Sequence, residues 1–294
     1  MKIDKLAVWL NTIGYTSAEL VAFAQRLEGW GYGTLWINDG MGSDPMVLAA
    51  RILAGTERLQ IALGVANIYS RDPVMMQGAQ YGLNEQWDNR FLLGMGVSHT
   101  FIVEAMRGHS YEKPVTTMRA YLEALTALDY PGPPPSEKPQ TVIAALGPKM
   151  LELARDSADG AHPFSTTPGH TAMARDILGP GKLLLVEQKI MLESDPAIAR
   201  AAGKGLVSGL SGIPNYRNNF LRMGFTEEDF ANGGSDRAAD AMLAWGDESA
   251  IRQRIQEHWD AGADQVAIQV QTRTGALLTP EDEKVLELLA PSGK

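Results

Sequence analysis

The segment "FLLGMGVSH" (residues 91–99) decides how the rest of the chain is interpreted. Its Gly-x-Gly start is typical of a dinucleotide-binding loop, but His99 stands where that fingerprint needs its third glycine. No helical pattern opens at this position, and an apolar run precedes Gly94. We therefore interpret the segment as the end of a buried strand, with a histidine placed just beyond it.

Similar short apolar runs recur along the whole chain, and helical sequence separates them. The predicted strands are residues 6–10, 34–38, 60–66, 91–97, 141–146, 161–164, 183–188 and 265–270. Alternation of this kind predicts an α/β fold with parallel strands, and eight strands predict a closed (β/α)8 TIM barrel. A doubly wound open sheet is the alternative. In a barrel, the chemistry belongs at the C-terminal ends of the strands.

Helix starts are marked by capping residues. Thr16 and Glu19 form a plausible capping box, and Asp44 and Asp72 each precede a proline at the first helical position. Residues 194–246 are too long for one helix, and we interpret them as a helical insertion between the seventh and eighth strands. The Pro-rich residues 130–140 have flanks that continue the same repeat, so we predict a single domain over residues 1–294.

Composition limits the possible functions. The chain has 294 residues and no cysteine, which excludes thiol catalysis and thiolate metal sites. A net charge of −9 argues against nucleic acid or an anionic membrane as the partner. No apolar run approaches the roughly 18 to 20 residues that span a bilayer. We expect a cytoplasmic protein, and no metal-binding spacing is present.

The helix predicted from Pro148 starts differently from the others. Its N-cap is Gly147, which has no side chain to bond the free N–H groups, and Lys149 lies in the first turn. A lysine there is unfavourable with the helix dipole unless an anion binds nearby, as a phosphate would. The alternative is a solvated helix start with Lys149 pointing away.

Polar residues also follow the second and third strands. Asn38 and Asp39 end the second, where Asp39 is either a functional carboxylate or a turn residue. Gly64 lies inside the third strand, which is typical of a bulge or of close approach by a ligand. Asn67, just beyond it, either bonds a ring edge or ends the strand.

Two histidines, His99 and His162, stand at predicted strand ends, where a near-neutral pKa suits proton transfer. Glu104 follows His99 and is either a further catalytic group or a structural partner of the loop after it. On the seventh strand, Glu187 or Gln188 must face inward or upward.

These segments resemble the luciferase-like flavin and deazaflavin oxidoreductases, in particular an actinobacterial branch that uses coenzyme F420. The resemblance runs end to end and includes "GYGTLWIND", "TERLQIALGVANIYSRDP", "RFLLGMGVSHTFIVEAMRGHSYEKPVTTMRAYLEAL", "AALGPKMLELARDSADGAHPF" and "AGADQVAIQV". It implies a (β/α)8 barrel with an insertion, a cofactor ring across the mouth, and a homodimer.

The resemblance also implies roles for single residues. A non-prolyl cis peptide behind the ring maps onto Gly64–Val65, and the phosphate-binding turn maps onto Gly147, Pro148 and Lys149. Asn38, Asn67 and His162 are further expected cofactor contacts, while His99, Asp39 and Glu104 are the expected catalytic residues.

The implied reaction is hydride transfer between F420 and a small organic substrate. Three alternatives stay open: an FMN-dependent monooxygenase using reduced flavin and O2, a flavin- or deazaflavin-binding protein without turnover, and a cofactor-independent barrel enzyme. Residues 99–115 and 194–246 are expected to shape the substrate pocket.

Overall fold

The predicted strands form a closed parallel barrel in a computed structural model that describes residues 1–40, 42–273 and 277–291. β10 pairs with both β1 and β8, which closes the ring and rules out the open doubly wound sheet. The barrel strands, in order, are β1 (Leu6–Leu10), β2 (Thr34–Ile37), β3 (Gln60–Leu63), β5 (Phe91–Gly96), β6 (Thr141–Ile143), β7 (Gly160–Ala161), β8 (Leu183–Leu192) and β10 (Gln265–Val270).

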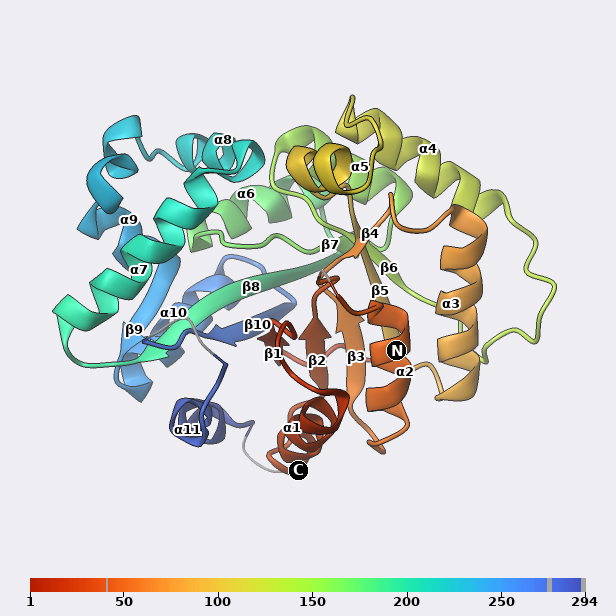
Figure 1. The fold of residues 1–294 in the computed structure, drawn as a ribbon, viewed down its shortest axis with the longest axis horizontal. Coiled ribbons are helices and arrows are strands. Elements are labelled where there is room, and N and C mark those ends of the chain that lie inside the picture. The colour runs from red at the N-terminus through yellow and green to blue at the C-terminus, as the bar shows by residue number, and fades with distance from the viewer. Residues whose placement is uncertain (41, 274–276, 292–294) are drawn as a thin grey trace.

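Helices surround this barrel (Figure 1). The capping box of Thr16 and Glu19 is confirmed, and Asp44 and Asp72 accept hydrogen bonds from first-turn N–H groups as predicted. The surrounding helices are α1 (Ser17–Gly29), α2 (Pro45–Leu53), α3 (Pro73–Gln86), α4 (Pro114–Ala127), α5 (Pro148–Ser157), α6 (Pro168–Leu178), α10 (Glu248–Asp260) and α11 (Pro280–Leu289).

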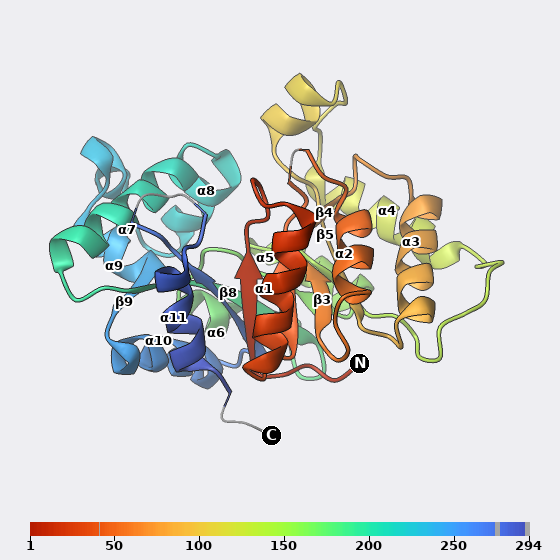
Figure 2. The same cartoon turned by 60° about the horizontal axis from the view of Figure 1, so that its bottom comes forward.

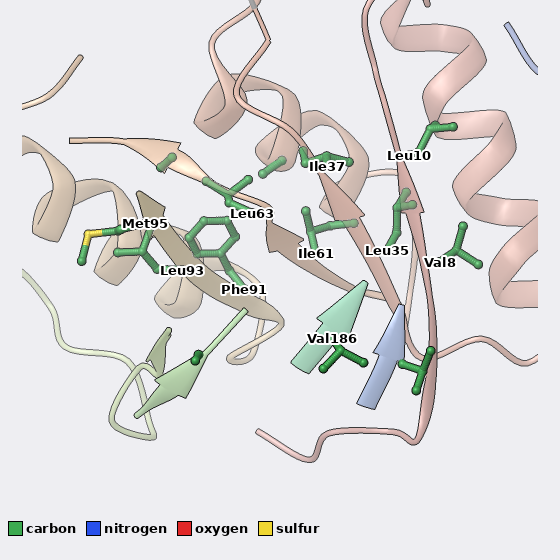
Figure 3. Packing of buried hydrophobic residues seen from close by; sticks show 14 of the residues in the cluster. Val8, Leu10, Leu35, Ile37, Ile61, Leu63, Phe91, Leu93, Met95 and Val186 are labelled. Carbon is green, nitrogen blue, oxygen red and sulfur yellow. The ribbon is translucent and has the colours of Figure 1, made fainter. Parts of the chain in front are cut away.

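Side-chain alternation along the strands divides the buried residues into two layers. Phe91, Leu93 and Met95 of β5 belong to the large cluster between barrel and helices (Figure 3). Leu92 points the other way, into an interior cluster with Trp9 and Trp36. Period-two alternation therefore decides which residues of each strand can reach the barrel mouth from inside.

The strand predicted over residues 60–66 is not continuous. β3 ends at Leu63, and the Gly64–Val65 peptide is cis, as the resemblance implied. The chain then forms the short strand β4 (Ala66–Asn67), which pairs with β5. The bulge turns the chain across the C-terminal end of the barrel.

The insertion is mostly helical, as predicted, with α7 (Pro196–Ser211), α8 (Pro214–Arg222), the turns η2 (Glu227–Asp229) and η3 (Ala231–Gly233), and α9 (Asp236–Met242). Two predicted bounds are wrong. Residues 243–246 form a strand, β9 (Leu243–Gly246), and β8 continues past Gln188 to Leu192 because its second half pairs with β9. Figure 2 shows α8 on the side of the barrel toward which the β1 arrow points.

Within the described ranges, no helix combines the length and apolar character that a membrane crossing requires.

Candidate functional site at the barrel mouth

The two glycines of the "GMG" segment make room for the bulge after β3. A Cβ atom on Gly94 would stand 1.9 Å from the carbonyl oxygen of Leu63, and one on Gly96 would stand 2.5 Å from Val65 Cγ2. Protein atoms of Leu63 and Val65 therefore occupy the open side of both glycines, and the immediate role of the glycines is to let the Gly64–Val65 turn pass.

Two polar residues after β2 bond neighbouring segments at this end of the barrel. Asn38 Oδ1 accepts hydrogen bonds from the backbone N–H and the hydroxyl of Thr12, at 2.8 and 2.9 Å. Asp39 Oδ2 accepts from the backbone N–H of Asn67 at 2.9 Å. Burial raises the pKa of Asp39, while the Asn67 bond and the charges of Arg107 and Arg71 oppose the rise. Asp39 therefore anchors β4, and its second carboxylate oxygen has no hydrogen bond within the described part of the chain.

His99 lies beyond β5 and meets the first turn of α8. Its Nδ1 atom is 3.1 Å from Oδ1 of Asn215, and its ring centroid is 5.6 Å from that of Tyr216. Because an amide oxygen only accepts, Nδ1 carries the proton and Nε2 is the basic nitrogen of the neutral ring. Burial lowers the pKa of His99, partly offset by the Asn215 bond. The neutral ring at pH 7 can therefore take a proton at Nε2.

Glu104 lies apart from this contact. It is exposed on the π-helical turn η1 (Ile102–Met106), and its Oε1 accepts from the backbone N–H of Tyr111 at 3.2 Å. Of the two roles that the sequence allowed for Glu104, this bond is the one expected of a structural partner of the loop. His109 is exposed on the same loop, 6.0 Å from the ring centroid of Tyr69.

The start of α5 is open, as the sequence indicated. Gly147 makes no side-chain cap, and Pro148 follows at the first helical position. Lys149 is exposed, and nothing in the described residues forms an ion pair with it. A Cβ on Gly147 would lie 3.4 Å from the guanidinium carbon of Arg222, at the end of α8. Free N–H groups and two cations thus share one helix terminus.

Arg222 is held there by the insertion itself. Its Nη1 donates to Oδ1 of Asn219 at 2.7 Å, and Asn219 is fully buried. Within the described residues, no carboxylate pairs with Arg222. A guanidinium beside the positive end of a helix is unfavourable without an anion, so the arrangement favours binding of a phosphate.

His162 lies inside the barrel and is only 2% exposed. Its ring stacks on Trp36 with centroids 4.0 Å apart, and its Nδ1 donates to the Leu185 carbonyl at 2.7 Å. Burial lowers its pKa to about 4. A Cβ on Gly64 would stand 3.1 Å from His162 Nε2, so the ring lies directly behind the bulge.

The inward residues of β8 form a buried ion pair. Lys189 Nζ lies 3.1 Å from both carboxylate oxygens of Glu187 and 2.6 Å from Ser165 Oγ. It also lies 3.8 Å from the ring centroid of Phe164. Gln188 points outward and accepts from His258 Nε2 at 2.9 Å. The sequence left open whether Glu187 or Gln188 faces inward. The structure shows that Glu187 faces the barrel interior and Gln188 faces the helices.

Sequence reasoning missed four residues of this mouth: Lys189, Asn215, Tyr216 and Arg222. Strand parity from Glu187 could have found Lys189, because both residues lie on one face of β8. The other three lie in the insertion, where helix pattern alone does not say which face meets the barrel.

Residues 4–178 match the model of the luciferase-like monooxygenase family. A 5,10-methylenetetrahydromethanopterin reductase from Methanolobus tindarius is 24% identical over 92% of this chain and 94% of its own. The F420-dependent tetrahydromethanopterin reductase of Methanopyrus kandleri has a similar fold, with a TM-score of 0.74 and 18% identity over 98% of both chains. So does the oxygenating constituent of 3,6-diketocamphane monooxygenase from Pseudomonas putida in complex with FMN, with a TM-score of 0.70 and 11% identity over 97% of both chains. The match over more than half of its length places the chain in the luciferase-like monooxygenase family.

Proposed function

We propose that the protein is an oxidoreductase that transfers hydride between coenzyme F420 and a small organic substrate at the C-terminal mouth of the barrel. The observation that carries this proposal is the open start of α5, where the Arg222 guanidinium lies beside Gly147 and Lys149 is exposed in the first turn, and neither cation pairs with a carboxylate of the described residues. The similarity to tetrahydromethanopterin reductases, one of them named as F420-dependent, supports the choice of cofactor.

The residues present fit such a cofactor. Its phosphate would bind the free N–H groups of α5, with Lys149 and Arg222 as charged partners. The bulge at Gly64–Val65 would back the ring, with Asn38 and Asn67 beside it. When bound, the deazaflavin supplies the hydride chemistry, and the protein supplies orientation and proton management.

His99 is the residue that we assign to proton transfer. Its Nδ1–H is held by Asn215, so Nε2 can accept a proton from a substrate hydroxyl or, once charged, return one to a carbonyl. Asp39 is a positioning residue for β4 through Asn67. Glu104 is assigned to loop structure through Tyr111.

FMN is the second candidate cofactor, because an FMN complex has the same fold and FMN also ends in a phosphate. We favour F420 because Lys149 and Arg222, which pair with no carboxylate among the described residues, suit a ligand with acidic groups beyond its phosphate. A binding protein without turnover and a cofactor-independent enzyme stay as lower alternatives.

Titration of the purified protein with F420 and with FMN tests the proposal. We expect F420 to bind more tightly, and the loaded protein to exchange hydride with a substrate. Binding of FMN alone would overturn the choice of cofactor, and binding of neither would favour a cofactor-independent enzyme. The homodimer stays a prediction, and measuring the mass of the protein in solution by light scattering would test it.

A further inference from the structure

A cavity of about 520 Å³ lies at the end of the barrel opposite the mouth. Its lining includes Thr141, where β6 begins, and Lys182, which directly precedes β8, so it lies at the N-terminal ends of these strands. Residues of α3 and of the second half of α4 also line it, together with Lys138 and Pro139 from the Pro-rich segment after α4 (Figure 1). The volume is in the range of small-molecule sites, and the proposed function makes no use of this cavity.

Two glutamines of α3 lie in the lining with their amide groups held in one orientation. Gln77 and Gln80 are only 7% and 3% exposed. The Nε2 atom of Gln77 donates to the backbone carbonyls of Leu125 and Leu128, at 3.3 and 3.2 Å. The Nε2 atom of Gln80 donates to the Gln140 carbonyl at 3.0 Å. These carbonyls fix both amides, because only the NH2 end of an amide can donate to a carbonyl oxygen.

The oxygen end of each amide has no partner. Oε1 of Gln77 and Oε1 of Gln80 accept no hydrogen bond from the described residues, and neither oxygen is sealed from solvent, as Oε1 of Gln140 is. Both side chains are more than nine-tenths buried, so the little surface that they keep includes a free acceptor. A ligand in this cavity would therefore bond them with N–H or O–H donors.

Charged groups of both signs also line the cavity. Asp156 is paired with Arg155 at 2.8 Å. Four other lining groups form no ion pair within the part of the chain that the structure describes: Glu123, Asp159, Lys138 and Lys182. The charges of these four sum to zero. A ligand that is neutral overall, but carries one charge of each sign, would thus find a counter-ion for both charges.

Asp159 and Gln80 are joined through a single residue. Asp159 Oδ2 accepts from the backbone N–H of Thr141 at 2.7 Å, and Gln80 Nε2 donates to Oγ1 of Thr141 at 2.9 Å. An ammonium group has three donors and a positive charge, so it suits an amide oxygen and a carboxylate that lie close together. Lys182 Nζ donates to the Ala158 carbonyl at 2.6 Å, which leaves it further donors for a carboxylate.

Much of the remaining lining is apolar. It includes the ring of Tyr81 and the side chains of Leu122, Leu125 and Leu128. An apolar group of the ligand would be removed from water against these side chains. The lining thus combines acceptors, ions of both signs and apolar surface.

We propose that this cavity binds a small zwitterion of the amino-acid type with an apolar side chain. Its ammonium group bonds the oxygens of Gln77 and Gln80 and the carboxylate of Asp159. Its carboxylate bonds Lys138 and Lys182. The inference does not depend on the proposed function, because the cavity and the mouth lie at opposite ends of the strands.

Three probes with the same phenylethyl body test the ligand class: L-phenylalanine, 2-phenylethylammonium, which lacks the carboxylate, and 3-phenylpropanoate, which lacks the ammonium. Each is titrated with the purified protein by ligand-observed NMR at pH 7.5. We expect L-phenylalanine to bind at least about tenfold more tightly than either of the others, because each of them loses charge-assisted hydrogen bonds. Equal or tighter binding of a probe with a single charge, or no binding of L-phenylalanine, would overturn the inference.

A charge reversal at Lys138 locates the carboxylate contact. Lys138→Glu should abolish the preference for L-phenylalanine over 2-phenylethylammonium. It should also raise the affinity for 2-phenylethylammonium about threefold, a gain that misfolding cannot produce. Lys113→Glu makes the same charge change at an exposed lysine at the other end of α4, and it should behave as wild type. A wild-type order of affinities in Lys138→Glu would contradict the assignment.

Gln77→Met tests the ammonium contact, because it removes the free amide oxygen at nearly constant side-chain length. We expect the affinity for L-phenylalanine to fall about three- to tenfold, while that for 3-phenylpropanoate, which has no ammonium, stays the same. The second probe thus reports whether the variant is folded. An equal loss for both probes, or no loss for either, would rule out the ammonium contact.

F420 titration of the same samples separates this inference from the proposed function. Protein saturated with F420 should bind L-phenylalanine as tightly as the free protein does, and competition between the two would place the probe at the mouth and overturn the inference. If F420 does not bind, the proposed function fails, and the order of affinities among the probes still decides the zwitterion site.

Discussion

The Nδ1 atom of His99 lies 3.1 Å from Oδ1 of Asn215, which joins the loop after β5 to the first turn of α8 above the barrel. This bond fixes the ring tautomer and stabilises the charged form of the ring. The insertion therefore controls the protonation of the residue that we assign to proton transfer.

Asn215→Ala should shift the acidic limb of the kcat/KM profile to lower pH. Burial already lowers the pKa of His99, and the Asn215 bond is the interaction that raises it, so its loss lowers the pKa further. His99→Ala should reduce kcat about 10²- to 10⁴-fold with little change in F420 affinity. If turnover survives His99→Ala intact, the histidine is structural.

Arg222→Ala and Lys149→Ala should each weaken F420 binding by about 1.5–3 kcal/mol, because each removes a charge-assisted contact with the phosphate. Fluorescence titration of F420 measures the loss. Arg58→Ala removes an exposed arginine whose nearest carboxylate, on Glu57, is 3.8 Å away, and it serves as control. If the affinity for F420 is unchanged in both Arg222→Ala and Lys149→Ala, the start of α5 is not the anion site.

Gly94→Ala should destabilise the protein by at least about 2 kcal/mol, because its Cβ would stand 1.9 Å from the Leu63 carbonyl oxygen. Gly78→Ala, in helix α3, adds a Cβ that has no described atom within 4 Å apart from the local helix backbone, and it should stabilise the protein by roughly 0.5–1 kcal/mol. Urea unfolding of both variants makes the comparison. Equal effects would mean that the close approach of β3 to β5 does not matter energetically.

Folding stability should fall as the pH drops below 6.5. Burial lowers the pKa of His162 to about 4 and that of His258 to about 3. Between pH 6.5 and these values, both imidazoles are protonated in the unfolded chain but stay neutral in the folded protein. Each ring should cost about 2 kcal/mol of stability between pH 7 and pH 5.

His258→Gln keeps a donor for Gln188 and removes one of these titrations. Its loss of stability over the same pH range, measured by urea unfolding, should be about 2 kcal/mol smaller than that of wild type. A pH profile parallel to that of wild type would contradict this.

Local signals were enough to predict most of the barrel. Asp44 and Asp72 mark helix starts through a contact within a single turn, and the open cap at Gly147 is equally local. β9 was missed because its four residues follow a helix directly and pair with β8, a contact distant in sequence. The same reason hid Arg222, whose role depends on where α8 docks.

The second difficulty for prediction was to decide which side chains of β8 face the barrel interior. Glu187 and Gln188 are adjacent polar residues in an apolar strand, and the sequence does not say which of them faces inward. Packing decides it: Gln188 bonds His258 outside the barrel, and Lys189 therefore joins Glu187 inside. Once Glu187 is known to face inward, strand parity puts Lys189 on the same face, but its contact with the Phe164 ring follows only from the three-dimensional arrangement.

The docking of α8 has an evolutionary consequence. Residues 4–178, which match the family, carry His99, Gly147 and Lys149, whereas their partners Asn215 and Arg222 lie outside that stretch. The family-matched part of the barrel thus presents half of each contact, and the insertion that lies beyond residue 178 completes it. Exchange of the insertion between relatives would then alter proton handling and cofactor retention together, while leaving the barrel that supports them untouched.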